Sequence, residues 1–94
     1  MPIVHLPAAL SGHAGGQRRL RLATPGPDAT VALLLDAMGR AHPGVRQRVL
    51  DELGALRPHV NVFVNGESIR YLDGLATPVR DGDELWIIPA VSGG

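Results

Sequence analysis

The last two residues, Gly93 and Gly94, are the feature of the chain best suited to chemistry. Because glycine has no Cβ, a segment ending in two glycines can thread a narrow channel, and nothing shields its carboxylate from attack. A carboxylate presented in this way is suited to activation as an acyl-adenylate by another enzyme that uses ATP. The alternative interpretation is a frayed chain end without a function.

Other residue types that carry chemistry are absent or wrongly spaced. The chain has no cysteine, and all nine of its basic residues are arginine, which excludes a thiol nucleophile, cysteine-ligated zinc and a Schiff-base lysine. Asp81-Gly82-Asp83 reads better as a turn than as a carboxylate pair, and Ser68 lacks the nucleophile-elbow pattern. We therefore predict no catalytic residue and no metal site. The four histidines lack metal-ligand spacing and are expected on the surface or in loops: His5, His13, His42 and His59.

Length and charge restrict the class of protein further. A chain of 94 residues allows one domain, and a formal net charge of zero argues against broad electrostatic binding to nucleic acid. The most apolar run, residues 31–35, is far shorter than the roughly 20 residues that span a bilayer. We expect a cytoplasmic protein with no membrane and no nucleic-acid partner.

The first half of the chain predicts two strands and a helix. Residues 3–10 are apolar and predict a strand, residues 11–16 a loop, and the alternation over residues 19–22 a half-buried second strand. Thr30 is a suitable N-cap for a helix that ends near Gly39 or the Pro43-Gly44 pair. A second, shorter helix is expected over residues 45–53. The main helix has one apolar stripe, formed by Val31, Leu34, Leu35 and Met38.

The last third predicts further strands. Residues 60–64 alternate, and Asn65-Gly66 favours a type I′ hairpin turn, with residues 68–71 as the return strand. Residues 84–88 form a final strand that leaves the sheet near Pro89. One amphipathic helix can cover only one sheet face, so the order predicts an α+β fold. The other face, which bears Phe63, is then open to solvent or to a partner.

Several segments carry a resemblance to a known family. The strand order, the hairpin at residues 60–66, Asp81-Gly82-Asp83 and the ending Ile-Pro-Ala-Val-Ser-Gly-Gly at residues 88–94 resemble the MoaD/ThiS sulfur carriers. Within that family, residues 13–17, residues 74–77 and the terminal segment most resemble the CysO-type carriers of cysteine biosynthesis. The resemblance implies a ubiquitin-like β-grasp fold, with a mixed sheet of four to five strands and one main helix on one face.

The resemblance also implies a mechanism. An E1-like enzyme uses ATP to adenylate the Gly94 carboxylate, and a sulfur donor displaces AMP to leave a thiocarboxylate. In CysO-type systems the acceptor is held on a PLP-dependent cysteine synthase, and a zinc metalloprotease later releases cysteine. The chain is then a co-substrate and not an enzyme, and it binds no cofactor itself. Residues 1–89 form the domain, and residues 90–94 form a flexible tail: Ala90, Val91, Ser92, Gly93 and Gly94.

A partner surface is expected beside this tail. In the β-grasp fold the third and last strands are neighbours, so an outward-facing Phe63 would lie beside Trp86 and Ile88. An exposed apolar patch of this kind usually marks an interaction site, and we expect the activating enzyme to bind there. In the alternative arrangement Trp86 packs into the core while Leu85 and Ile87 face outwards.

Other functions remain open from the sequence. The sulfur acceptor could instead be a precursor of molybdopterin, of thiamin or of a natural product. The chain could be a ubiquitin-like modifier that forms isopeptide bonds to target lysines through Gly94. It could also be a plain β-grasp interaction module.

Overall fold

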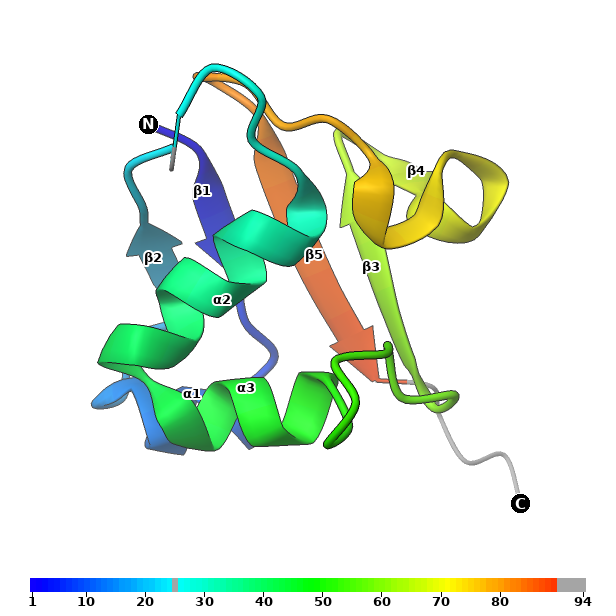
Figure 1. The fold of residues 1–94 in the computed structure, drawn as a ribbon. Helices are drawn as coiled ribbons and strands as arrows, with labels where there is room; N and C mark the ends of the chain where they lie inside the picture. The colour runs from blue at the N-terminus through cyan, green and yellow to red at the C-terminus, as the bar shows by residue number, and fades with distance from the viewer. Residues whose placement is uncertain (25, 90–94) are drawn as a thin grey trace.

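The computed structural model describes residues 1–24 and 26–89 as a sheet covered on one face by helices (Figure 1). The sheet order is β2-β1-β5-β3-β4. β1 and β5 are parallel, whereas the other neighbouring strands are antiparallel, so the sheet is mixed, as predicted. The strands are β1 (Ile3–His5), β2 (Arg19–Arg21), β3 (Val60–Val64), β4 (Glu67–Ser68) and β5 (Glu84–Pro89).

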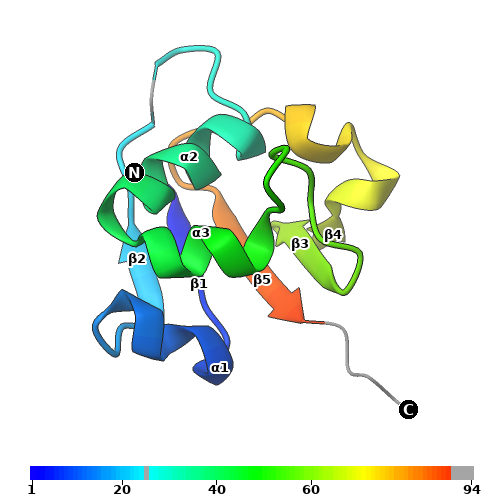
Figure 2. The same ribbon diagram turned by 60° about the horizontal axis from the view of Figure 1, so that its bottom comes forward.

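The helices lie on one face of this sheet and close the core (Figure 2). They are α1 (Ala8–Ser11), α2 (Val31–Ala41) and α3 (Pro43–Val49), with short 3₁₀ segments at Gly12–Ala14, Ile69–Tyr71 and Gly74–Ala76. Every second strand residue points towards α2 and α3 and is buried, including Val4, Leu20, Val62, Leu85 and Ile87. None of the described helices has both the length and the apolar character needed to cross a membrane.

The main helix, α2, forms where the apolar stripe and cap predict it. The Oγ1 of Thr30 accepts a hydrogen bond from the Leu33 N–H at 3.3 Å, and all four stripe residues are fully buried. The helix ends at Ala41, directly before His42 and the Pro43-Gly44 pair that the sequence marked as its end, and it passes through Gly39. α3 packs against this point: a Cβ on Gly39 would collide with the side chain of Arg46. The glycine therefore serves helix packing and not termination.

Three other sequence predictions were wrong in detail. The predicted strand over residues 3–10 stops at His5, because Pro7 has no N–H and its carbonyl accepts from two later N–H groups that start α1. The predicted return strand over residues 68–71 stops at Ser68, whose Oγ accepts from the Arg70 N–H and turns the chain into a 3₁₀ segment. The second helix ends at Val49, and Leu53 is 94% exposed.

The turn between β3 and β4 has the predicted conformation. Asn65 has φ 49° and Gly66 has φ 91°, the positive values that a type I′ turn requires. The Asn65 side chain also reaches the start of β5: its Oδ1 accepts from the Glu84 N–H at 3.0 Å and its Nδ2 donates to Asp83 Oδ1 at 2.9 Å. The turn thereby fixes where β5 enters the sheet.

Candidate functional site: the open sheet face and the root of the tail

The strand that leads into the predicted tail lies in the centre of the sheet. β5 is bonded to β1 on one side and to β3 on the other, and its last residue, Pro89, lies opposite Val60. The tail itself lies outside the described residues. Its predicted roles, above all adenylation at Gly94, therefore stay predictions for Ala90, Val91, Ser92, Gly93 and Gly94.

The strand residues that point away from the helices form what we term the open face. In the register of β3 and β5, Phe63 lies opposite Trp86 and Asn61 lies opposite Ile88. Trp86 is 45% exposed and Ile88 44% exposed, while Phe63 is half-buried. We call these three apolar side chains the apolar strip: Phe63, Trp86 and Ile88. The strip reaches Ile88, which immediately precedes Pro89 at the root of the tail.

The alternative orientation of β5 is wrong. Leu85 is 0% exposed and Ile87 2% exposed, because both point into the layer between sheet and helices. Trp86 accordingly faces outwards, where a partner can reach it. The partner role of the strip is a separate matter and remains a prediction.

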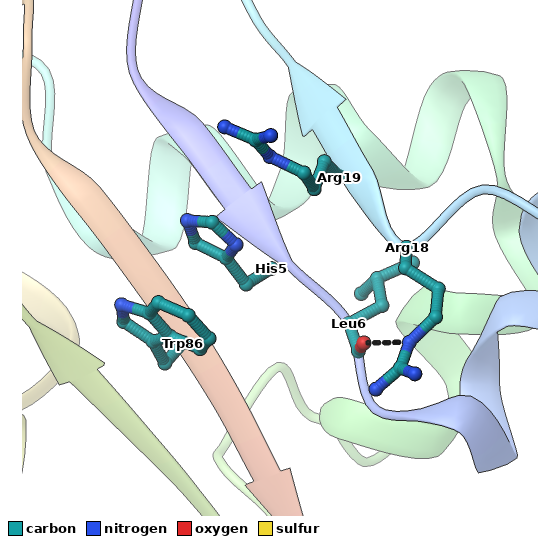
Figure 3. Close-up of a pocket in the computed structure, with 5 residues that line it drawn as sticks. All are labelled: His5, Leu6, Arg18, Arg19 and Trp86. Carbon is teal, nitrogen blue, oxygen red and sulfur yellow. Dashed lines mark hydrogen bonds between the residues drawn. The ribbon is translucent and has the colours of Figure 1, made fainter.

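Sequence reasoning missed the contact that holds the indole ring of Trp86. His5, expected on the surface or in a loop, lies on β1 directly opposite Trp86, and the two rings stack with centroids 3.7 Å apart and planes 6° apart. Figure 3 shows the imidazole beside the indole. The His5 Nε2 also lies 2.6 Å from Glu84 Oε1, so two residues of β5 hold the imidazole. The signal that could have found this pair is the parallel pairing of the first and last strands.

The open face continues onto β2 as a polar surface. Arg19 and Arg21 alternate with the buried Leu20 and are exposed. Arg19 lies opposite His5 in the register. The neighbouring Arg18 is tied to the backbone, since its Nε donates to the Leu6 carbonyl at 3.3 Å, as the dashed line in Figure 3 marks.

Over the described strands, the open face is a surface without an enclosed pocket. In residues 1–24 and 26–89, no group of three or more histidine, aspartate or glutamate side chains could hold a metal ion. The hollows on the open face are wide open to solvent. Such a surface is suited to contact with another protein, while a reaction at the end of the tail stays a prediction.

Comparison with known proteins gives a consistent family. The sequence model of the ThiS family matches residues 4–94. The sulfur carrier protein CysO of Mycobacterium tuberculosis is 34% identical over 93 residues, covering 97% of this chain and 96% of the relative.

Solved structures agree in fold as well as in sequence. A chain from the crystal structure of the Amycolatopsis orientalis BexX/CysO complex is 37% identical, covers 100% of both chains and has a TM-score of 0.87. The crystal structure of small archaeal modifier protein 1 from Haloferax volcanii is 41% identical, with 99% and 98% coverage and a TM-score of 0.83. These neighbours share the mixed sheet with helices on one face, which is the ubiquitin-like β-grasp fold. The chain therefore belongs to the ThiS family and is a sulfur carrier protein of the ThiS, MoaD and CysO type, a small protein substrate rather than a catalyst.

Proposed function

We propose that this carrier holds sulfur as a thiocarboxylate on Gly94 and donates it in cysteine biosynthesis. The observation that carries the proposal is the family match, which runs through residue 94 and so includes Gly93-Gly94. The direction of β5 supports it, because the central strand leads into this segment from the middle of the sheet. The likeness to CysO over nearly the full length of both chains supports cysteine as the product.

The reaction needs two steps that the carrier cannot catalyse. First, a carboxylate oxygen of Gly94 attacks the α-phosphorus of ATP and releases pyrophosphate, which leaves an acyl-adenylate. Next, a sulfur nucleophile such as hydrosulfide attacks the acyl carbon, AMP leaves, and a proton is released to water. The resulting thiocarboxylate is a soft nucleophile that stays ionised at neutral pH and can attack an activated acceptor.

Partner enzymes supply the catalysis in this proposal. An E1-like enzyme binds the apolar strip, takes the tail and uses ATP, so the carrier itself binds no cofactor. A PLP-dependent cysteine synthase then presents the acceptor, and a zinc metalloprotease releases cysteine from the carrier. The structure of a CysO in complex with BexX supports the assembly of such carriers with another protein.

A protein modifier is the second candidate. Its support is the 41% identity to an archaeal protein named as a small modifier. In that role Gly94 would form isopeptide bonds to lysines of target proteins. The carrier has no lysine of its own, so no such bond could form between its copies.

Mass spectrometry of the chain isolated from its own host separates these functions. A species with sulfur in place of one terminal oxygen is expected, and deletion of Gly94 should abolish it. High-mass adducts on other proteins would support the modifier instead, and unmodified chain alone would leave a plain interaction module. Sulfur transfer by the chain lacking Gly94 would contradict the mechanism.

A second assay identifies the acceptor. The thiocarboxylate form is incubated separately with a PLP-dependent cysteine synthase and its activated serine substrate, and with a molybdopterin precursor and its synthase. Consumption of the thiocarboxylate in the first mixture alone is the expected result. Consumption only in the second would assign the carrier to molybdopterin.

A further inference from the structure

Two arginines extend the open face beyond the apolar strip. Arg19 lies opposite His5, and His5 lies opposite Trp86, so the three side chains form one row across β2, β1 and β5. Because neighbouring strands are about 4.8 Å apart, Arg19 is roughly 10 Å from Trp86 along this row. A standard interface covers about 800 Å² on each partner. One partner can therefore cover the apolar strip and the arginines together.

The open face carries an excess of positive charge that the whole chain does not have. The formal net charge is zero, yet among the described strand residues of this face Arg19 and Arg21 are accompanied by one carboxylate, that of Glu84. Glu84 is already paired with His5. Neither arginine forms an ion pair within the described part of the chain. The face is thus complementary to a surface that carries carboxylates.

The surface around Arg19 is shaped as well as charged. Two open hollows meet at this residue, and the second is drawn in Figure 3. The planar guanidinium group binds carboxylates through two parallel hydrogen bonds, and a hollow on each side gives a partner side chain room to approach. The first hollow is lined by Ile3, Gln17, Arg19 and Arg21, and the second by His5, Leu6, Arg18, Arg19 and Trp86.

The backbone of β2 is also open on its outer side. The Leu6 N–H donates to the Arg18 carbonyl at 2.8 Å, and the Leu22 N–H donates to the Pro2 carbonyl at 3.1 Å. In an antiparallel ladder the residues between such pairs point their N–H and C=O groups the other way, so those of Arg19 and Arg21 point outwards from the edge of the sheet. Charged side chains on an edge strand can also serve only to prevent aggregation. An experiment has to separate that role from binding.

We propose that Arg19 and Arg21 bind a carboxylate-rich surface of the activating enzyme while the apolar strip contacts an apolar surface beside it. This inference rests on the proposed function, since it takes the activating enzyme as the partner. The arginines speed association and make it dependent on salt. The apolar strip holds the complex together once it has formed, close to the root of the tail.

The test compares two double charge reversals in the full chain. Arg19→Glu with Arg21→Glu removes the charge complementarity to a partner's carboxylates but keeps the edge strand charged. If the two arginines serve only to prevent aggregation, this variant should bind as well as wild type. Arg40→Glu with Arg80→Glu changes two exposed arginines off the open face and alters the net charge equally. Binding to the adenylating enzyme encoded in the same genome is measured at about 50 mM and about 300 mM NaCl, because salt screens such contacts.

The wild-type chain is expected to bind more weakly at the higher salt concentration. At the lower concentration, reversal of Arg19 and Arg21 should raise Kd by about tenfold or more and flatten the salt dependence, whereas the control pair should stay within about twofold of wild type. The neutral variant with glutamine at both positions should lie between them. Thermal melts followed by circular dichroism check that each variant is folded.

Several outcomes would overturn the inference. One is a wild-type Kd that does not change with salt, and another is an equal loss of binding affinity in both double reversals. A third is no binding by the wild-type chain at either salt concentration. Thiocarboxylate formation is followed in parallel by mass spectrometry. Salt-dependent binding lost only on reversal of Arg19 and Arg21, but without any thiocarboxylate, would support the docking surface and contradict the proposed function. If the variant with Arg19 and Arg21 reversed forms the thiocarboxylate at the wild-type rate and binds with the wild-type Kd, the proposed function would be supported and the docking surface contradicted.

Discussion

At the scale of single residues, the apolar strip is the surface that we propose binds the activating enzyme. Phe63 lies opposite Trp86 in the register and is half-buried, so its ring adds apolar area to the open face. Aromatic side chains in such positions often dominate binding energy. A charge placed among them would have to be desolvated when a partner covers the strip.

Phe63→Asp is therefore expected to weaken adenylation by the activating enzyme. The expected result is a rise of about tenfold or more in the carrier concentration that gives half-maximal ATP–pyrophosphate exchange, because a desolvated charge costs more than about 1.4 kcal/mol. The matched control is Leu53→Asp, an almost fully exposed leucine in the loop after α3, which should leave exchange unchanged. Unchanged folding and exchange in Phe63→Asp would mean that the strip does not bind the enzyme.

The stack of His5 on Trp86 predicts a spectroscopic change. Trp86 is the single tryptophan of the chain, so its fluorescence reports on this one site. His5→Ala uncovers one face of the indole, and acrylamide should then quench the emission more strongly than in wild type. His59→Ala, at an exposed position, is the control. Equal quenching in all three proteins would contradict a stable stack.

At the scale of elements, the contact between α2 and α3 depends on a residue without a side chain. The Arg46 side chain crosses Gly39, and its Nε donates to Asp36 Oδ1 at 3.1 Å. An alanine at position 39 would favour the helix by about 1 kcal/mol, but it would also push against Arg46. Forcing an extra carbon into a packed contact typically costs about 1–3 kcal/mol.

We expect Gly39→Ala to lower the free energy of unfolding by about 1 kcal/mol, since the cost of the contact exceeds the gain in helix propensity. In an Arg46→Ala background the same change should instead stabilise the protein, because the obstructing side chain is gone. Urea denaturation of the four proteins of this cycle measures the coupling. Destabilisation of equal size in both backgrounds would rule out the proposed contact.

The same elements show how far the sequence determines the fold. The period of α2, the alternation of β3 and the Asn65-Gly66 turn are local signals, and each of these elements forms as predicted. The failures occur where a local hydrogen bond turns the chain, as at Pro7 and Ser68, or where the decisive contact is distant in sequence. Ser68 ends β4 by accepting the Arg70 N–H, and Gly39 looks like a helix end until α3 is packed against it. The stack of His5 on Trp86 was missed for the same reason, because no local pattern shows it and only the parallel pairing of β1 with β5 brings the two residues together.

At the scale of the whole molecule, the buried core extends from Val4 to Ile87 and joins all the main elements. We therefore expect the stability of the domain not to depend on residues 90–94. In the proposed function the domain offers a surface for recognition and the tail offers the reacting atom. That division would let one small protein serve several enzymes in turn.

Removal of residues 90–94 should therefore abolish thiocarboxylate formation and leave the fold unchanged. The expected free energy of unfolding in urea is that of wild type within about 0.5 kcal/mol, the range typical of changes away from structural contacts. Binding to the activating enzyme through the open face should persist, though more weakly. A clear loss of stability would show that the boundary at residue 89 is misplaced.

The central place of β5 has a mechanical consequence. In the proposed function, an enzyme that draws residues 90–94 into its active site would pull on the C-terminal end of this strand. Because β5 is held by ladders to β1 and β3, such a pull loads two rows of hydrogen bonds together in shear instead of peeling them apart one at a time. Such resistance to unfolding would let the carrier stay folded through each cycle of the proposed sulfur transfer.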